Sequence, residues 1–263
     1  NDFLQNLEKK CSKLKMGKMQ VEELLQREED EVLNRMHLPP NIAKNQAQKE
    51  NVFALFVCIL TKTPIFICGK PGSSKSFAVQ LILNNLRGKD SQDPYFRLLP
   101  QLIPVSYQGS EYSTSKSILD VFSRAEKYLN IAQNKEILPV IIFDEIGLAE
   151  LSVDNPLKVL HDKLEIENIK VPFVGISNWR LDASKMNRAL YLARPDPEEQ
   201  DLISTAEAIC GANINLGLMN TKIIRGLATA YCELRNLLKD KKKFCINIVK
   251  VCSVKALSLI KGE

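Results

Sequence analysis

A strand, a glycine-rich turn and the start of a helix are indicated by the stretch "PIFICGKPGSSKS", residues 64–76. Its apolar residues are followed by two glycines and a proline, and it ends on a lysine and a hydroxyl side chain. The segment from Gly69 to Ser76 matches the phosphate-loop pattern G-x-x-x-x-G-K-[ST], except that Ser74 stands where glycine is usual. Alone, such a pattern also describes an ordinary glycine turn between a strand and a helix. The apolar strand before it and the helical pattern after it favour a phosphate loop.

Each part of this loop has an expected task. Backbone N–H groups would turn inward around an anion at a helix N-terminus, where the helix dipole favours negative charge. Lys75 would contact the β- and γ-phosphates, and the Ser76 hydroxyl would bind Mg²⁺. Ser74 adds a Cβ near the phosphate and restricts the backbone. The expected nucleotide-binding residues of the loop are Gly69, Lys70, Pro71, Gly72, Ser73, Ser74, Lys75 and Ser76.

Two acids follow a second apolar strand in "PVIIFDEIG", residues 139–147. Side chains alternate along a strand, so Asp144 and Glu145 can take different tasks. We expect Asp144 to hold the hydration shell of the magnesium ion and Glu145 to orient and polarise the attacking water. Without the phosphate loop, two solvated acids at the end of a strand would be the simpler interpretation.

Polar and cationic residues follow two further strands. In "VPFVGISNWR", residues 171–180, Asn178 would lie at the same sheet edge and hold the γ-phosphate and the water in line; the alternative is an asparagine at a turn. In "MNRALYLARP", residues 186–195, Arg188 fits a guanidinium presented to a neighbouring molecule better than Arg194 does. Surface ion pairing is the alternative for either arginine.

Short apolar runs alternate with amphipathic segments in the middle of the chain, which predicts an α/β fold with a five-stranded parallel sheet flanked by helices. The predicted domains are an N-terminal helical region, the α/β core and, after Pro195-Asp196-Pro197, a small helical lid: residues 1–37, 38–196 and 197–263. The expected strands are 65–68, 102–107, 140–143, 171–176 and 189–193, and the expected helices are 45–60, 76–86, 115–129, 156–165, 181–187, 198–209 and 220–238.

Composition restricts the functions to consider. The 263 residues carry a net charge of +5 and are 45% hydrophobic, and no apolar run reaches the roughly 18 residues of a membrane span. The chain begins at Asn1, which suggests a piece of a longer protein. Seven cysteines without a C-x-x-C pair indicate reduced thiols in the cytosol or nucleus and no zinc site. The basic run at residues 239–243 is interpreted as a solvated loop, and direct nucleic-acid binding is not expected.

Taken in order, these motifs resemble an AAA+ ATPase module, over about residues 38–240. More narrowly, "GKPGSSKS", "YQGSEYST", "FDEIGLAE", "NPLKVLHDKLE" and "GISNWRLDASKMNRALYLARPDP" resemble the AAA+ units, in particular the fourth, of the mysterin family of giant RING-type E3 ubiquitin ligases. Ser74 belongs to that narrower pattern. The resemblance implies ATP and Mg²⁺ as cofactors, and it assigns Lys75, Asp144, Glu145, Asn178 and Arg188 the tasks given above.

The same resemblance implies a wider setting. The N-terminal region would be a linker or the lid of a preceding unit, and Ile42 and Ala43 would border the adenine. The partners would be adjacent AAA+ modules of the same chain and, through the parent protein, the ubiquitination machinery. The location would be cytoplasmic, with the parent protein at lipid droplets. The lid of the family often presents a sensing arginine, and "KKKFCINIVKVCSVKALSLIKGE" lacks the run that would carry it, so the lid is incomplete or divergent.

Two functions therefore remain open. The first is an ATPase module that couples binding and hydrolysis of Mg·ATP to movement, which Lys75 and Glu145 favour. The second is a structural or regulatory module that holds nucleotide with little or no turnover, which the unusual lid favours. A GTPase and a small-molecule kinase are poor fits, because neither a base-reading aspartate nor an acceptor-site motif is found.

Overall fold

The computed structural model describes residues 18–40, 42–131, 136–165, 169–211 and 218–239. The chain divides into two compact units. The first unit comprises Asn1–Leu38 and Ala47–Asp196, and the second comprises Pro39–Gln46 and Pro197–Glu263. The change of unit after Asp196 coincides with the predicted start of the helical lid, whereas residues 39–46 group with the second unit and not with the core.

One parallel sheet of five strands forms the centre of the first unit, in the order β2-β3-β4-β1-β5. The α/β prediction with a five-stranded parallel sheet is thereby confirmed. Every residue of β1 and β4 is buried, because helices cover both faces of the sheet. The strands are β1 Ile65–Cys68, β2 Gln101–Gln108, β3 Ile137–Asp144, β4 Phe173–Ser177 and β5 Leu190–Ala193.

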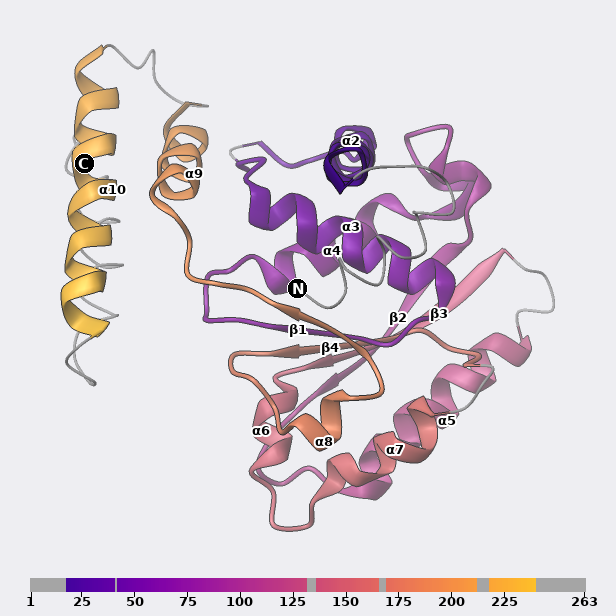
Figure 1. Ribbon diagram of the computed structural model, residues 1–263. Coiled ribbons are helices and arrows are strands. Elements are labelled where there is room, and N and C mark those ends of the chain that lie inside the picture. Colours follow the sequence, from indigo (N-terminus) through magenta and orange to yellow (C-terminus); the bar gives the residue numbers. More distant parts are fainter. Residues whose placement is uncertain (1–17, 41, 132–135, 166–168, 212–217, 240–263) are drawn as a thin grey trace, which may run out of the picture. The chain divides into compact units, whose positions relative to one another are not determined.

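The pleat of the strands divides the core into two apolar clusters. Ile65 and Ile67 of β1 pack into the cluster on one face, and Phe66 and Cys68 pack into the cluster on the other. Figure 1 shows the helices of each cluster on opposite sides of the sheet. The first cluster includes α2 (Lys18–Arg35), α3 (Gln46–Thr61) and α4 (Lys75–Asn85); the second includes α5 (Ser115–Ile131), α6 (Ile146–Glu150), α7 (Val159–Leu164) and α8 (Ala183–Met186).

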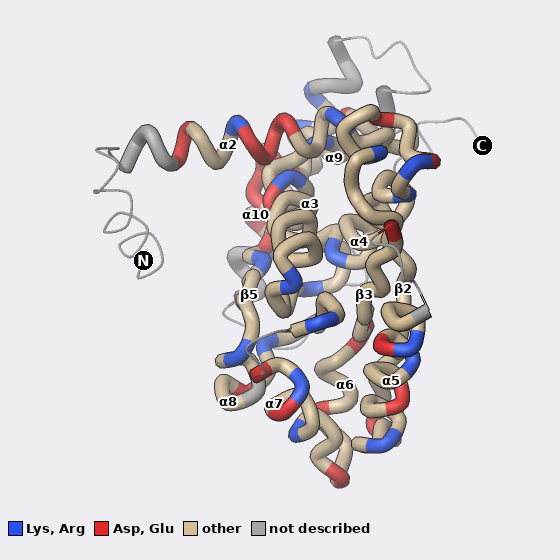
Figure 2. The backbone as a smooth tube through the Cα atoms, turned by 90° about the vertical axis from the view of Figure 1, so that its right-hand side faces the viewer, with Lys and Arg blue, Asp and Glu red and all other residues tan. Residues whose placement is uncertain are grey.

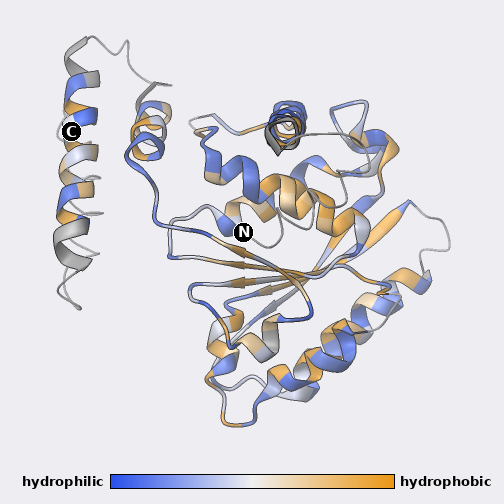
Figure 3. Cartoon of the chain, viewed as in Figure 1, coloured by the Kyte–Doolittle hydropathy of each residue, from blue (hydrophilic) through white to orange (hydrophobic). Residues whose placement is uncertain are grey.

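Hydropathy follows this layering. Figure 3 shows apolar residues along the strands and on α3 and α4, while α2 and α5 carry more hydrophilic residues. Charged residues lie along the length of α2 in Figure 2, and the buried apolar residues of this helix, among those whose burial is described, are Val32 and Leu33 near its C-terminus. The imperfect apolar stripe predicted for this region therefore corresponds to a helix that is buried at one end. Residues 1–17 of the predicted N-terminal helix lie outside the described residues.

Three local predictions need correction. The helix α6 was not predicted, because five residues are too few to show a helical period. The helix predicted over 156–165 begins as a 3₁₀ turn at Pro156–Lys158 and continues as α7. The strand predicted to begin at Val171 begins at Phe173.

The described part of the second unit contains two helices, α9 (Glu199–Gly211) and α10 (Leu218–Lys239). Ile203, Ile224 and Ala228 form a buried apolar cluster among its described residues. The hydroxyl of Thr229 on α10 donates a hydrogen bond of 2.6 Å to Glu199 on α9. Residues 240–263, with most of the basic run and the divergent end, lie outside the described residues. Among the helices described in either unit, none is long and apolar enough to cross a membrane.

Candidate functional site

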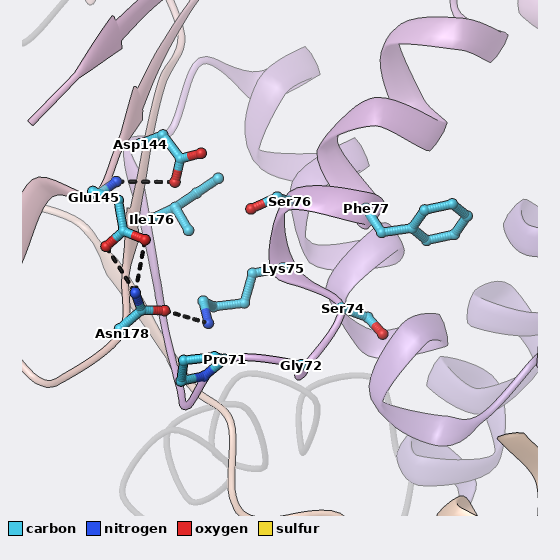
Figure 4. A pocket seen from close by; sticks show the side chains of 10 residues that line it. All are labelled: Pro71, Gly72, Ser74, Lys75, Ser76, Phe77, Asp144, Glu145, Ile176 and Asn178. Carbon is cyan, nitrogen blue, oxygen red and sulfur yellow. Dashed lines mark hydrogen bonds between the residues drawn. The ribbon is translucent and has the colours of Figure 1, made fainter. Parts of the chain in front are cut away.

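The strand order brings three polar segments to one edge of the sheet. β4 lies between β3 and β1, and all three strands run in the same direction. The two acids at the end of β3, the asparagine after β4 and the glycine-rich loop after β1 therefore meet at the carboxyl ends of these strands. They enclose a cavity of about 400 Å³. Figure 4 shows the residues that line it: Pro71, Gly72, Ser74, Lys75, Ser76, Phe77, Asp144, Glu145, Ile176 and Asn178.

The glycine-rich loop takes a tight path before α4. The Gly69 N–H donates to Ser177 O at 3.1 Å, which joins the loop to the end of β4. Gly72 has φ of 87°, in the region that favours glycine. Ser74 is also left-handed, with φ of 58°, and it directly precedes α4. The position where the motif usually has glycine thus needs the conformation that glycine adopts most easily, and a serine occupies it at some cost in strain.

Lys75 places a buried ammonium group in this loop. The residue is only 5% exposed. Its Nζ donates to the carbonyl oxygens of Gly69 at 2.5 Å and Lys70 at 3.0 Å, and to Ser73 Oγ at 3.2 Å. Burial lowers the pKa of Lys75, while the nearby carboxylates oppose that shift. The ammonium is therefore held by acceptors of its own loop, and a phosphate could replace them as a stronger partner.

Asp144 is the last residue of β3 and Glu145 follows it, and their carboxylates make different contacts, although not through the predicted alternation along a strand. Asp144 Oδ1 accepts a hydrogen bond of 2.9 Å from the Glu145 N–H, and both Asp144 and Ser76 line the cavity. Glu145 has φ of 50° and directly precedes α6. This left-handed residue turns the chain away from the strand, so that the two carboxylates do not lie on opposite faces of a continued strand.

Asn178 connects the loop with the second acid. Its Oδ1 accepts from Lys75 Nζ at 3.2 Å, and its Nδ2 donates to both carboxylate oxygens of Glu145 at 2.7 Å. Figure 4 shows these three side chains in a continuous hydrogen-bonded row. Asn178 lies beside the two acids, as expected from the strand ends. The hydrogen bonds between Asn178 and Glu145 were not predicted.

Two glycines near the site were missed by reasoning from the sequence. A Cβ on Gly109 would lie 2.3 Å from Glu145 O, and a Cβ on Gly147 would lie 2.7 Å from the Trp179 ring. Both positions therefore allow the backbone around Glu145 to pack closely against neighbouring segments. Gly109 directly follows β2, where a glycine after a strand is a recognisable sign of close backbone approach.

The candidate arginines lie in ion pairs. Arg188 is half-buried and pairs with Glu165, and its NH1 donates to Ser184 O at 2.8 Å. Arg194 is 6% exposed at its side chain and pairs with Glu50 at 2.5 Å. Neither is among the residues that line the cavity. The action of Arg188 on a neighbouring molecule stays a prediction.

The adenine contacts expected of Ile42 and Ala43 also stay a prediction. Both residues are described, half-buried and without regular secondary structure. They lie in the segment Pro39–Gln46 that groups with the second unit.

Residues 41–201 match a family model described as the RNF213 AAA domain. The chain belongs to the RNF213 AAA domain family. The match spans the phosphate loop, both acids, Asn178 and Arg188. The predicted resemblance to the AAA+ units of the mysterin family, also called RNF213, is thereby confirmed.

Curated relatives of this RNF213-type AAA domain support the same family. The chain is 42% identical over 196 residues to the E3 ubiquitin-protein ligase RNF213 of Homo sapiens, covering 72% of the chain and 4% of that protein. It is 39% identical over 215 residues to the E3 ubiquitin-protein ligase rnf213-beta of Danio rerio, covering 78% of the chain and 4% of that protein. The chain thus spans about one twenty-fifth of the length of the curated relatives it matches.

Solved structures similar to this AAA domain include C. elegans PCH-2, with a TM-score of 0.45 and 15% identity over 88% of this chain and 73% of that one. The ORC2 protein of Aeropyrum pernix, described as ADPNP-ADP complexes, also has a TM-score of 0.45, with 13% identity over 65% of this chain and 53% of that one. The AAA fold of the present chain rests on the family match and on its own sheet order.

Proposed function

We propose that this AAA domain binds Mg·ATP in the cavity at the carboxyl edge of the sheet and hydrolyses its terminal phosphoanhydride. The observation that supports this most directly is the row formed by Lys75, Asn178 and Glu145. It joins a buried cation of the phosphate loop to a carboxylate through one amide. Lys75 and Glu145 line the same cavity, which supports a phosphate-binding role for the first and a general-base role for the second.

The residues present fit the proposed cofactors. The buried Lys75 ammonium and the N-terminus of α4 are suited to the negative charge of the phosphates. The Ser76 hydroxyl and the Asp144 carboxylate supply hard oxygen ligands in the same cavity, which is the ligand type that Mg²⁺ prefers. When bound there, the ion would neutralise charge on the phosphate oxygens.

In the proposed reaction, the residues of the row have different tasks. Lys75 exchanges the carbonyls of its own loop for phosphate oxygens and so holds the transferred group. Glu145 accepts the proton of the attacking water, since its carboxylate is the available base in this row. Asn178 orients that carboxylate through its amide, and after release its amide can hold the water in line.

A module that holds nucleotide with little turnover is a second candidate function. Both oxygens of Glu145 accept from Asn178, and the Arg188 guanidinium is engaged by Glu165. In this state the base is occupied, and the arginine is bound within its own chain. These contacts favour slow hydrolysis by the isolated chain.

We further propose that the module works beside other AAA+ modules within a longer chain, and that this chain is an E3 ubiquitin-protein ligase, as its relatives are named. The ubiquitin-transfer elements would lie outside these 263 residues. A cytoplasmic location, with the parent protein at lipid droplets, belongs to the same proposal. In such an assembly Arg188 would leave Glu165 and face the nucleotide of a neighbouring module.

Titration with ATP and ADP, with and without Mg²⁺, tests the proposed function. Lys75→Ala should weaken nucleotide binding about 10- to 100-fold, because hydrogen bonds to charged groups contribute about 1.5–3 kcal/mol. Glu145→Gln should bind ATP but lower phosphate release at least about 100-fold. Trp179, the one tryptophan of the chain, lies next to Asn178 in sequence and provides a fluorescence readout.

Lys89→Ala is the matched control, because Lys89 pairs with Glu136 at an exposed site outside the cavity. Unchanged ATP binding by Lys75→Ala would contradict the assignment of the phosphate loop. Phosphate release that is undetectable in the unaltered chain as well as in Glu145→Gln, with tight binding in both, would favour the nucleotide-holding module.

A further inference from the structure

A partly buried ion pair lies beside the phosphate loop. Arg194 NH2 is 2.5 Å from Glu50 Oε2, and the Arg194 side chain is 6% exposed. The Arg194 N–H donates to Cys68 O at 2.7 Å, directly before the loop. A Cβ on Gly69 would lie 2.6 Å from Arg194 Cβ, so the two backbones pack closely. Arg194 is therefore fixed against the first residue of the loop.

The residue after Glu50 holds the other part of the loop. Asn51 is fully buried on α3, and its Nδ2 donates to Ser73 O at 3.1 Å. Glu50 thus connects to the start of the loop through Arg194, while Asn51 contacts the loop directly. We call Glu50, Asn51 and Arg194 the loop clamp.

The loop clamp contacts the loop in which Lys75 must change its hydrogen-bond partners when a phosphate binds. Lys75 Nζ now bonds to the carbonyls of Gly69 and Lys70, and it must release them to contact a phosphate. Two buried clamp atoms, Arg194 Nε and Asn51 Oδ1, lack a hydrogen-bond partner among the described residues. Arg194 Nε can therefore still donate a hydrogen bond and Asn51 Oδ1 can still accept one. The hydrogen bonds of the clamp can change while the ion pair between Arg194 and Glu50 is kept.

We infer that the loop clamp is a set of positioning residues that determines nucleotide affinity by holding the loop from behind. None of its three members lines the cavity, so none is expected to contact the phosphates. The inference rests on the proposed function of the loop. The clamp acts on the part of the loop that meets phosphates common to ATP and ADP, so both nucleotides are affected alike.

A double-mutant cycle tests the clamp in the 263-residue chain. Glu50→Gln and Arg194→Gln should each weaken binding of Mg·ATP and Mg·ADP by about tenfold, since coupled contacts change equilibria by this order. The double variant should lose about the same tenfold and not a hundredfold, because both changes break one ion pair. Asn51→Ala should give a similar loss.

Glu136→Gln, which breaks an exposed pair with Lys89 before β3, should leave both affinities unchanged. Each variant's melting temperature without nucleotide is measured in parallel. A merely structural clamp would lower that temperature and leave the affinities unchanged, and this result would overturn the inference, as would additive losses. If Arg194→Gln does not fold, Glu50→Gln still decides, since Glu50 is 34% exposed at its side chain.

Lys75→Ala distinguishes a failure of the proposed function from a failure of the loop clamp. Normal binding by this variant, or no binding by the unaltered chain, would refute the proposed function itself. Weak binding by Lys75→Ala together with normal binding by the clamp variants would refute the clamp alone.

Discussion

The described residues of the two units differ in how much apolar core they form. In the first unit a five-stranded sheet separates two large apolar clusters, and it holds a buried lysine and a buried arginine at its edge. In the second unit the buried cluster of the described residues is Ile203, Ile224 and Ala228. A charged group can be kept out of water only where surrounding packing and hydrogen bonds hold it in place. All residues to which we assign a catalytic task accordingly belong to the first unit.

Strained backbone conformations, like the large apolar clusters, belong to the first unit among the described residues. Non-glycine residues with positive φ, among those described, are Lys62, Ser74, Glu145 and Asn155, and all belong to the first unit. Two of them, Ser74 and Glu145, directly precede helices at the candidate site. Such conformations persist where the surrounding structure determines them strongly. The large core of the first unit provides that support.

The largest expected effect is on the stability of the first unit. Phe173 is fully buried, and its ring lies 5.7 Å from that of Phe66, 6.0 Å from Phe122 and 6.4 Å from Phe143. Phe173→Ala should lower the free energy of unfolding by about 4 kcal/mol through lost burial and a new cavity. Urea unfolding followed by Trp179 fluorescence reports this unit, because Trp179 lies within it.

Ile224→Ala is the matched change in the second unit. It should cost about 2 kcal/mol, at the low end for such truncations, because few of the described residues around Ile224 are buried. The Trp179 transition should remain where it is, while hydrogen exchange of α10 amides accelerates. Equal costs for the two substitutions would show that the second unit has a more extensive core than its described residues contain.

The sequence predicts those features of the site that depend on neighbouring residues. The apolar run before Gly69, the acids after Phe143 and the asparagine after Ser177 each follow from a local pattern. Parallel strands then bring them to one edge. For this reason the five strands and most of the residues that line the cavity could be predicted without the structure, whereas Phe77 and Ile176, which also line it, were not.

Long-range pairing could not be predicted in this way. Glu50 and Arg194 are remote in sequence, and nothing near either residue indicates its partner. The same holds for Arg188 and Glu165, which the sequence leaves as an open choice between an ion pair and a trans-acting residue. The short helix after Glu145 was also missed, since its start depends on a left-handed glutamate and not on a periodic pattern.

A smaller effect on stability is expected from the ionisation of a buried thiol in the first apolar cluster. Cys58 is buried on α3, and burial raises the pKa of its thiol from 9.0 to about 11. Above pH 9 the unfolded chain releases this proton, whereas the folded chain retains it until about pH 11. Stability should therefore fall between these pH values, by about 2 kcal/mol from this group.

Cys58→Ala isolates that contribution. The difference in unfolding free energy between the unaltered chain and this variant, measured by urea titration from pH 8 to pH 11, should change with the sign given above. A difference that stays constant across this range would mean that the thiolate is accommodated in the core, and that the first unit tolerates buried charge away from its site.

The smallest expected effect concerns Ser74, where the motif and the backbone conformation disagree. Its φ of 58° is easier for glycine, and no side-chain hydrogen bond caps α4 from this position. Ser74→Gly should therefore raise the free energy of unfolding by about 1 kcal/mol, since the relieved strain exceeds the added freedom of the unfolded chain. Ser74→Ala keeps the Cβ and should give no such gain. Lys62→Gly, at φ of 57° outside the cavity, should stabilise by a similar amount. A gain at position 62 but not at position 74, in urea unfolding followed by Trp179 fluorescence, would show that the serine makes a compensating contact in the loop, and that the strain at the site is smaller than its backbone angle implies.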